Sequence, residues 1–229
     1  MTAAELPVGE RKAQAVEEMF DRIAPRYDLV NRVMTLGLDA GWRRRAVREL
    51  RLPAGAHVID LGCGTGDLCK VLDRAGHRAL GVDVAAGMLA RAHTAAPLVR
   101  ADALHLPLRD ASVDGTISGF ALRNVVDIDA CFREAARVIR PGGRAVFLEV
   151  SEPRSAALRR LHGLYFRRIV PLIGGLISDR QAYRYLPAST AYLPPARELV
   201  RMLDEAGFSQ CRRVQLGAGA AQLLVGTRR

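Results

Sequence analysis

The sequence predicts an α/β protein with one mostly parallel sheet and helices on both faces of it. Between residues 57 and 150, short apolar segments typical of strands alternate with segments of helical periodicity. A glycine-rich turn follows the first apolar segment, at the point where a strand would pass into a helix. The 229 residues, 49% of them apolar, suffice for one domain with a sizeable core.

The chain begins with helical segments. We expect a helix over residues 9–23 that ends before Pro25, and its apolar face consists of Val16, Met19, Phe20 and Ile23. Further helices are expected over residues 32–36 and 39–50, with Asp39 as the N-cap of the second. The apolar stripe of that helix consists of Trp42, Ala46, Val47 and Leu50.

Strands and helices then alternate. The expected strands are residues 57–60, 79–83, 98–101, 115–120 and 144–150, and the expected helices are 65–75, 85–94 and 127–139. After Pro153 come two helical patches, a helix over 196–206, and a final strand pair near 213–216 and 222–226. Without repeats or low-complexity linkers, residues 1–229 are interpreted as a single domain, with a helical cap (1–50), a core (55–150) and covering helices with the last strands (151–229).

The glycine-rich turn favours a cationic ligand. Gly62, Gly64 and Gly66 have the spacing G-x-G-x-G, whereas dinucleotide folds use G-x-G-x-x-G with the pyrophosphate at the helix N-terminus. Asp60 and Asp67 flank the turn, and carboxylates would repel a pyrophosphate. S-adenosyl-L-methionine carries a sulfonium and an ammonium and no phosphate. These charges favour that cofactor over NAD.

Two further carboxylates follow later strands. Asp83 ends the strand 79–83 and is expected to accept hydrogen bonds from both ribose hydroxyls, the alternative being a solvated turn aspartate. Asp102 follows the strand 98–101, where its side chain could reach the adenine amine while the Ala103 amide meets a ring nitrogen. Carboxylates at the carboxyl ends of three consecutive strands indicate a ligand site along that edge, because open α/β sheets bind ligands there.

Charge and cysteine content set limits on partners and location. The net charge is +10, and apart from two lysines the basic residues are arginines, which is typical of compositional bias but also fits an anionic lipid surface. No aromatic residues alternate with the arginine clusters as base stacking requires, so nucleic acid is disfavoured. The four cysteines lack metal-ligand or disulfide spacing, and no signal-peptide core is present, so we expect a cytoplasmic protein without a metal.

Three stretches resemble one known family. The glycine-rich loop, Asp83 and the R-P-G-G turn at 140–143 look like class I S-adenosylmethionine-dependent methyltransferases. Residues 20–31 (FDRIAPRYDLVN), 119–125 (GFALRNV) and 182–189 (AYRYLPAS) are similar to ubiquinone/menaquinone-biosynthesis C-methyltransferases, a resemblance that covers residues 13–226. It implies a Rossmann-like, seven-stranded sheet with an N-terminal helical lid. By the same resemblance, Thr65, Asp83, Asp102 and Ala103 match cofactor-contacting positions.

The resemblance also implies a substrate, a prenylated naphthoquinol. The reaction would methylate a ring carbon of demethylmenaquinol to give menaquinol. The family pattern S-F-G-L-R-N is here G-F-A-L-R-N, so Gly119 lacks the serine hydroxyl at this cofactor position and Ala121 adds a methyl group. A methyltransferase of another quinone or aromatic polyketide therefore remains an alternative. A nucleic-acid methyltransferase and a non-catalytic cofactor-binding scaffold are less favoured, because the amine-methylation motif is absent and the glycines are present.

Chemistry on a ring carbon requires a phenolate, and ionising a phenol at pH 7 costs roughly 4 kcal/mol. Arg123 is the candidate that stabilises this phenolate and Asn124 the candidate that positions it, although Arg123 could equally form a structural ion pair. Tyr27, Asp28 and Asn31 are expected to form a lid that excludes water, or alternatively a capped turn between helices. No general base is assigned.

The segment 167–177 (RRIVPLIGGLI) places basic residues before a short apolar run. The run is too short to span a bilayer. It could line a groove for an isoprenoid tail or touch the inner face of the membrane peripherally, and a buried helix pair is the favoured alternative. The sequence does not indicate an oligomeric state.

Overall fold

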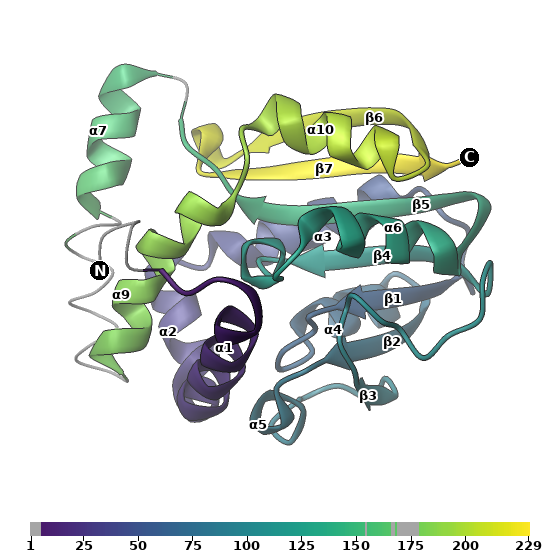
Figure 1. Ribbon diagram of the computed structural model, residues 1–229, viewed down its shortest axis with the longest axis horizontal. Coiled ribbons are helices and arrows are strands. Elements are labelled where there is room, and N and C mark those ends of the chain that lie inside the picture. The colour runs from purple at the N-terminus through teal and green to yellow at the C-terminus, as the bar shows by residue number, and fades with distance from the viewer. Residues whose placement is uncertain (1–5, 154, 166–167, 169–178) are drawn as a thin grey trace.

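The computed structural model describes residues 6–153, 155–165, 168 and 179–229. Its centre is a seven-stranded sheet with the strand order β3-β2-β1-β4-β5-β7-β6 (Figure 1). The strands are β1 (His57–Leu61), β2 (Arg78–Asp83), β3 (Leu98–Arg100), β4 (Val113–Gly119), β5 (Ile139–Val150), β6 (Phe208–Leu216) and β7 (Ala221–Arg228). The first five strands are parallel, and β7 runs antiparallel between β5 and β6. The predicted fold class is confirmed.

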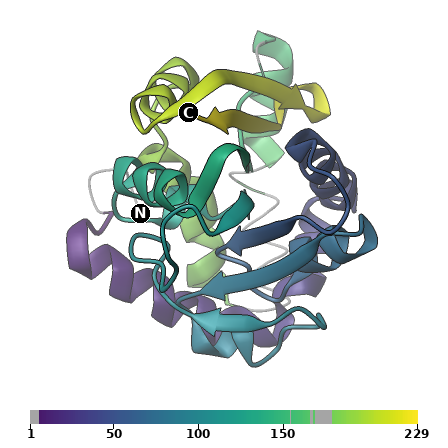
Figure 2. The same cartoon turned by 90° about the vertical axis from the view of Figure 1, so that its right-hand side faces the viewer.

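Helices cover both faces of the sheet, as Figure 2 shows. The helices are α1 (Gly9–Ile23), α2 (Tyr27–Met34), α3 (Leu38–Leu50), α4 (Asp67–Arg74), α5 (Ala86–Leu89), α6 (Ile128–Val138), α7 (Ala156–Leu164), α9 (Arg180–Ser189) and α10 (Ala196–Glu205). Short 3-10 turns occupy Ala24–Arg26, Leu122–Asn124 (η3), Thr190–Tyr192 (η5) and Gly217–Gly219. None of the helices in the described part of the chain is long and apolar enough to cross a bilayer.

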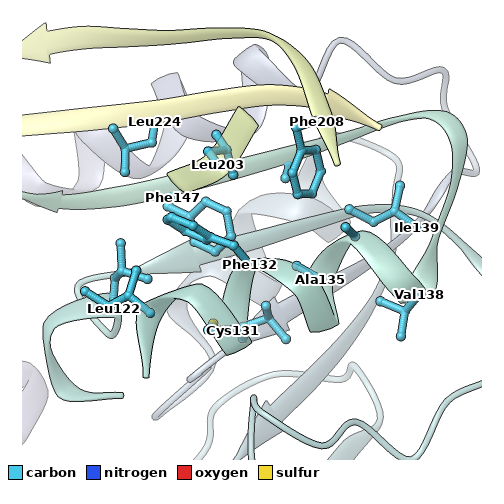
Figure 3. Close-up of a cluster of buried hydrophobic side chains, with 14 of the residues drawn as sticks. Leu122, Cys131, Phe132, Ala135, Val138, Ile139, Phe147, Leu203, Phe208 and Leu224 are labelled. Atoms are coloured by element: carbon cyan, nitrogen blue, oxygen red, sulfur yellow. The ribbon is translucent and has the colours of Figure 1, made fainter. Parts of the chain in front are cut away.

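The core has one cluster on each face of the sheet. On one face α6 and α10 pack on β4, β5 and β7, with the Phe132 and Phe147 rings 4.8 Å apart at the centre (Figure 3). On the other face α3 and α4 bury the stripe of Ala46, Val47 and Leu50 against β1 and β5. Burial of such side chains supplies most of the folding free energy, about 1.5–3 kcal/mol for each large one.

A third apolar cluster joins the N-terminal helices to α5 and α9 at the carboxyl ends of the parallel strands (Figure 1). The predicted apolar face of α1 is confirmed, since Val16, Met19 and Ile23 are buried in this cluster. The N-terminal helices therefore lie over the sheet edge where the candidate ligand-binding residues end their strands.

Four expectations about element ends were wrong, each for a local reason. Asp39 is not an N-cap, because α3 begins at Leu38 after Gly37 at φ +74°, and the Asp39 carboxylate instead pairs with Arg43. α2 begins at residue 27, so the lid candidates are helical. α5 stops at residue 89, because the amide of His93 donates to Thr65 O at 3.0 Å. β5 begins at residue 139, because a register shift carries the strand through the R-P-G-G turn.

Candidate active site

The glycine-rich loop leaves β1 with backbone angles that favour glycine. Gly62, Gly64 and Gly66 have φ values of +68°, +54° and +84°. A Cβ at Gly62 would lie 2.5 Å from the Cβ of Ala121, so the loop packs directly on the chain that follows β4. A Cβ at Gly64 would meet nothing within 4 Å. The loop is thus closely packed at its first glycine and open at its second.

One cavity gathers most of the predicted binding residues. Its lining includes Gly62, Gly64, Asp83, Asp102, Ala103, Gly119, Asn124 and Tyr27. These residues come from the ends of four strands and from α2, as expected for a site at the carboxyl edge of an open sheet. Five other candidates are outside this lining: Asp28, Asn31, Asp60, Thr65 and Arg123.

Asp83 is held by two backbone amides. Its Oδ2 accepts a hydrogen bond from Gly64 N at 2.7 Å, and its Oδ1 accepts one from Ala85 N at 2.9 Å. Burial raises the pKa of this carboxyl group, while the amides act in the opposite direction. Each carboxylate oxygen has a second lone pair, so both can still accept a hydroxyl from a ligand in the cavity. The geometry therefore fits the expected pair of ribose hydroxyls.

Asp60 is buried behind the loop and does not line the cavity. Its side chain is 1% exposed, the Cys69 thiol donates to Oδ2 at 3.5 Å, and Oδ1 has no partner. Burial raises the pKa of Asp60 to about 7. The other flanking carboxylate, Asp67, lies 3.7 Å from Arg43. The sequence argument placed both carboxylates beside the glycine-rich turn, and neither of them lines the cavity.

The lid candidates contact the glycine-rich loop from α2. Thr65 Oγ1 donates to Asp28 Oδ1 at 2.6 Å, so a lid residue binds the loop directly. Tyr27 lines the cavity, and its ring centre lies 5.9 Å from that of Phe20 on α1. Burial raises the pKa of Tyr27, and a hydrogen bond with Asn31 partly offsets this rise. α2 is therefore attached to the loop rather than free above it.

Arg123 forms the ion pair that the sequence left open as an alternative. Its Nη1 lies 2.5 Å from Glu149 Oε1, and Glu149 is 0% exposed. The same guanidinium donates to Phe120 O at 2.7 Å and, through Nε, to Ser189 Oγ at 3.1 Å. A buried pair with this geometry fixes η3 onto β5 and α9.

Asn124 is the member of η3 that lines the cavity. Its Oδ1 accepts a hydrogen bond from the Tyr185 hydroxyl at 3.4 Å, and its Nδ2 donates to Phe120 O at 3.4 Å. Burial raises the pKa of Tyr185, so this hydroxyl remains protonated and acts as a donor. Asn124 is oriented by α9 on one side and by the end of β4 on the other.

The altered positions of the G-F-A motif have steric explanations. A Cβ at Gly119 would lie 2.8 Å from Leu68 Cδ1, so a serine there would require Leu68 to move. Ala121 fills the space beside Gly62. Gly119 and Ala121 thus lie where α4 and the glycine-rich loop closely approach the end of β4.

Sequence reasoning missed several residues around this site. Glu149, Tyr185, Tyr192 and Lys12 carry its polar contacts, and Val84 and Met88 add apolar lining. Glu149 follows an apolar run as Asp60 and Asp83 do, and this signal could have been used. The apolar part of the segment 167–177 lies outside the described residues. In the described part no cluster of three or more His, Cys, Asp or Glu residues could hold a metal ion.

Comparison with known proteins identifies the family. The model of the ubiE/COQ5 methyltransferase family matches residues 8–228. The chain belongs to this family. It is 44% identical to the demethylmenaquinone methyltransferase of Roseiflexus castenholzii over 98% of both chains, and 42% identical to that of Thermus thermophilus over 92% of this chain and 100% of the relative. It is 40% identical to the ubiquinone/menaquinone biosynthesis C-methyltransferase UbiE of Syntrophotalea carbinolica, over 95% of this chain and 96% of the relative.

Solved structures agree on the fold. A methyltransferase of Thermotoga maritima superposes with a TM-score of 0.66 at 21% identity, over 93% of this chain and 100% of that one. Phosphoethanolamine N-methyltransferase 2 of Haemonchus contortus, solved with S-adenosyl-L-methionine, superposes with a TM-score of 0.62. The two chains are 13% identical, and the match covers 82% of this chain and 52% of that one. The chain is therefore a class I methyltransferase that uses S-adenosyl-L-methionine, as its family and the loop predict.

Proposed function

We propose that the protein transfers a methyl group from S-adenosyl-L-methionine to a ring carbon of demethylmenaquinol, giving menaquinol. The observation that carries this proposal is the 44% identity, over 98% of both chains, to a protein named demethylmenaquinone methyltransferase. The cavity supports it, because acceptors for a ribose lie beside an apolar lining that suits an aromatic ring.

The residues of the cavity fit the cofactor. Asp83 is assigned to the ribose hydroxyls, and Asp102 with the Ala103 amide to the adenine edge. The open space at Gly64 and the backbone of Gly62 and Gly119 leave room for the methionine part, while Thr65 and Asp60 support the loop from outside the lining. When bound, S-adenosyl-L-methionine supplies an electrophilic methyl group and a positive charge. The chain supplies position and a dry environment.

Residues of this chain would favour the phenolate through electrostatics and orientation. Asn124 reaches the cavity, so its amide can contact the substrate oxygen. Arg123 holds Asn124 through the carbonyl of Phe120 that they share, and its charge is largely balanced by Glu149. We therefore assign Arg123 mainly to positioning. Tyr27 on α2 covers the cavity and excludes water.

Peripheral contact with the inner face of the membrane is part of this proposal, because a prenylated quinol resides in the bilayer. Four exposed apolar residues lie on α2, the turn after it and the start of α3: Leu29, Val33, Leu36, which is 78% exposed, and Leu38. Exposed apolar side chains on a protein of net charge +10 suit an anionic lipid surface. Flotation with anionic vesicles tests this: Leu36→Glu should reduce binding, and equal binding by the variant would contradict it.

The reaction is tested by mass spectrometry of purified protein with S-adenosyl-L-methionine and chemically reduced demethylmenaquinone. A product heavier by one methyl group, absent with the oxidised quinone, supports both the substrate and the phenolate. No product, despite measurable cofactor binding, would refute demethylmenaquinol as the substrate. Other demethylated quinols tested in parallel would then identify the substrate class.

A further inference from the structure

Lys12 is a buried cation beside the active site. It lies on α1 and is 4% exposed. Its Nζ donates to the carbonyl of Val125 at 2.6 Å and lies 3.7 Å from the centre of the Tyr192 ring. Burial lowers the pKa of Lys12 to about 8. A buried ammonium is expensive, so a lysine at this position indicates that its contacts have a purpose.

The contacts of Lys12 form a closed network with the loop that carries Asn124. Val125 follows Asn124 directly, so the Lys12 bond reaches this loop from one side. On the other side, the Tyr192 ring lies 6.5 Å from that of Tyr185, and the Tyr185 hydroxyl donates to Asn124 Oδ1. The network thus joins α1, the loop after β4 and the α9–η5 segment.

α1 is attached at several places, and just before it the carbonyl of Pro7 accepts a hydrogen bond from the Tyr192 hydroxyl. Its second half is held from the cofactor side, since Asp21 Oδ1 accepts from Gly87 N at 2.7 Å and Glu17 lies 2.7 Å from Arg100. Its first half is held at Lys12, next to the loop of Asn124. Loss of the Lys12 contacts would therefore loosen the first half of α1 and leave the cofactor side in place.

We propose that Lys12 is a positioning residue for methyl transfer, which holds the first half of α1 and the Asn124 loop together as one wall of the cavity. Ala13, Val16 and Val125 form this wall. An apolar residue at position 12 would leave the partly buried Val125 carbonyl without this donor. The inference rests on the proposed function, because it assumes that the quinol binds beside Asn124.

The test compares Lys12→Met and Lys12→Arg with Arg11→Met, which removes a cation from an exposed site on the same helix. We expect Lys12→Met to lower kcat/KM for the quinol at least about tenfold, while the Kd of S-adenosyl-L-methionine changes less than about threefold. Hydrogen exchange should accelerate over residues 9–16 and stay unchanged over 17–23. Lys12→Arg should restore most activity, because a guanidinium also donates and stacks on tyrosine.

Wild-type turnover by Lys12→Met would overturn the proposal. So would a loss of kcat/KM in Arg11→Met, or in a fully folded Lys12→Arg, as large as that in Lys12→Met. If Lys12→Met does not fold, Lys12→Gln takes its place, because its uncharged side chain is one bond shorter and loses both the reach to Val125 O and the cation on the Tyr192 ring; unchanged exchange over residues 9–16 would then overturn the proposal. A wild-type enzyme inactive on the quinol would refute the proposed function alone. The exchange and cofactor-affinity measurements would still decide the role of Lys12.

Discussion

Replacement of Asp83 is the sharpest test of how this site binds its cofactor. The carboxylate accepts from Gly64 N and Ala85 N, and each oxygen keeps a lone pair for a ribose hydroxyl. A hydrogen bond to a charged group contributes about 1.5–3 kcal/mol, so two of them contribute roughly 3–6 kcal/mol. Burial of the carboxylate, which raises its pKa, opposes this gain and places the net effect below this range, at about 1.4–2.7 kcal/mol.

We therefore expect Asp83→Ala to raise the Kd of S-adenosyl-L-methionine at least about tenfold, and by up to about a hundredfold. The Kd of Asp83→Asn should lie between those of the wild type and Asp83→Ala. Its amide offers one acceptor oxygen and must turn its NH₂ toward Gly64 N or Ala85 N. Isothermal titration calorimetry measures both. Asp110→Asn, an exposed aspartate outside the cavity lining, controls for the charge change. A Kd for Asp83→Ala within twofold of wild type would refute the ribose assignment.

Three other changes test the neighbouring contacts. Arg123→Lys should lower both turnover and Tm, because one ammonium cannot replace a guanidinium that binds Glu149, a carbonyl and a hydroxyl; unchanged turnover would argue against any role of the planar group. Gly62→Ala should weaken cofactor binding, because the added Cβ displaces the loop from Ala121. In a double-mutant cycle, Ala121→Gly should restore part of the lost affinity, and purely additive effects would exclude the contact. Asp60 has a pKa raised to about 7, so its stabilising contribution is full below about pH 4 and is lost as pH rises through 7. Asp60→Asn should remove this pH dependence from the free energy of unfolding measured in urea. If the wild type and the variant differ in that free energy by the same amount at pH 5 and pH 8, the burial argument is contradicted.

Sequence reasoning succeeded where local chemistry decides the structure. The three glycines, the apolar runs and Asp83 require only the backbone and the neighbouring residues, and the structure confirms the loop and the strands they predict. Sequence reasoning failed where contacts with other side chains or other segments decide where a helix ends or which group a side chain binds. α5 ends early because His93 N bonds Thr65 O, and Asp39 leaves its expected capping role because Arg43 is one helical turn away.

The same limit explains why the sequence alone left two roles open for Arg123. Its partner Glu149 is 26 residues away on β5 and its contact Ser189 is on α9, so no spacing rule could have chosen between phenolate binding and an ion pair. Lys12 shows the limit more strongly, since its acceptor Val125 is 113 residues away in sequence. Such contacts are set by the packing of α1 on the sheet edge, which only the complete fold specifies.

The structure agrees with the preference of the glycine-rich loop for a cationic ligand over a pyrophosphate. Its physical basis is not the repulsion by the flanking aspartates that the sequence suggested. In a dinucleotide site the amides of the glycine loop and the first turn of the helix bind phosphate. Here Gly64 N already donates to the Asp83 carboxylate and Gly66 N to Cys63 O. The first residue of α4 is Asp67, and its carboxylate is turned to Arg43, 3.7 Å away, rather than lining the cavity. A pyrophosphate would have to displace the Asp83 carboxylate from Gly64 N, whereas a sulfonium or an ammonium meets no such opposition. Cofactor choice is therefore set by which group occupies the loop amides, and an aspartate from the neighbouring strand occupies the amide of Gly64.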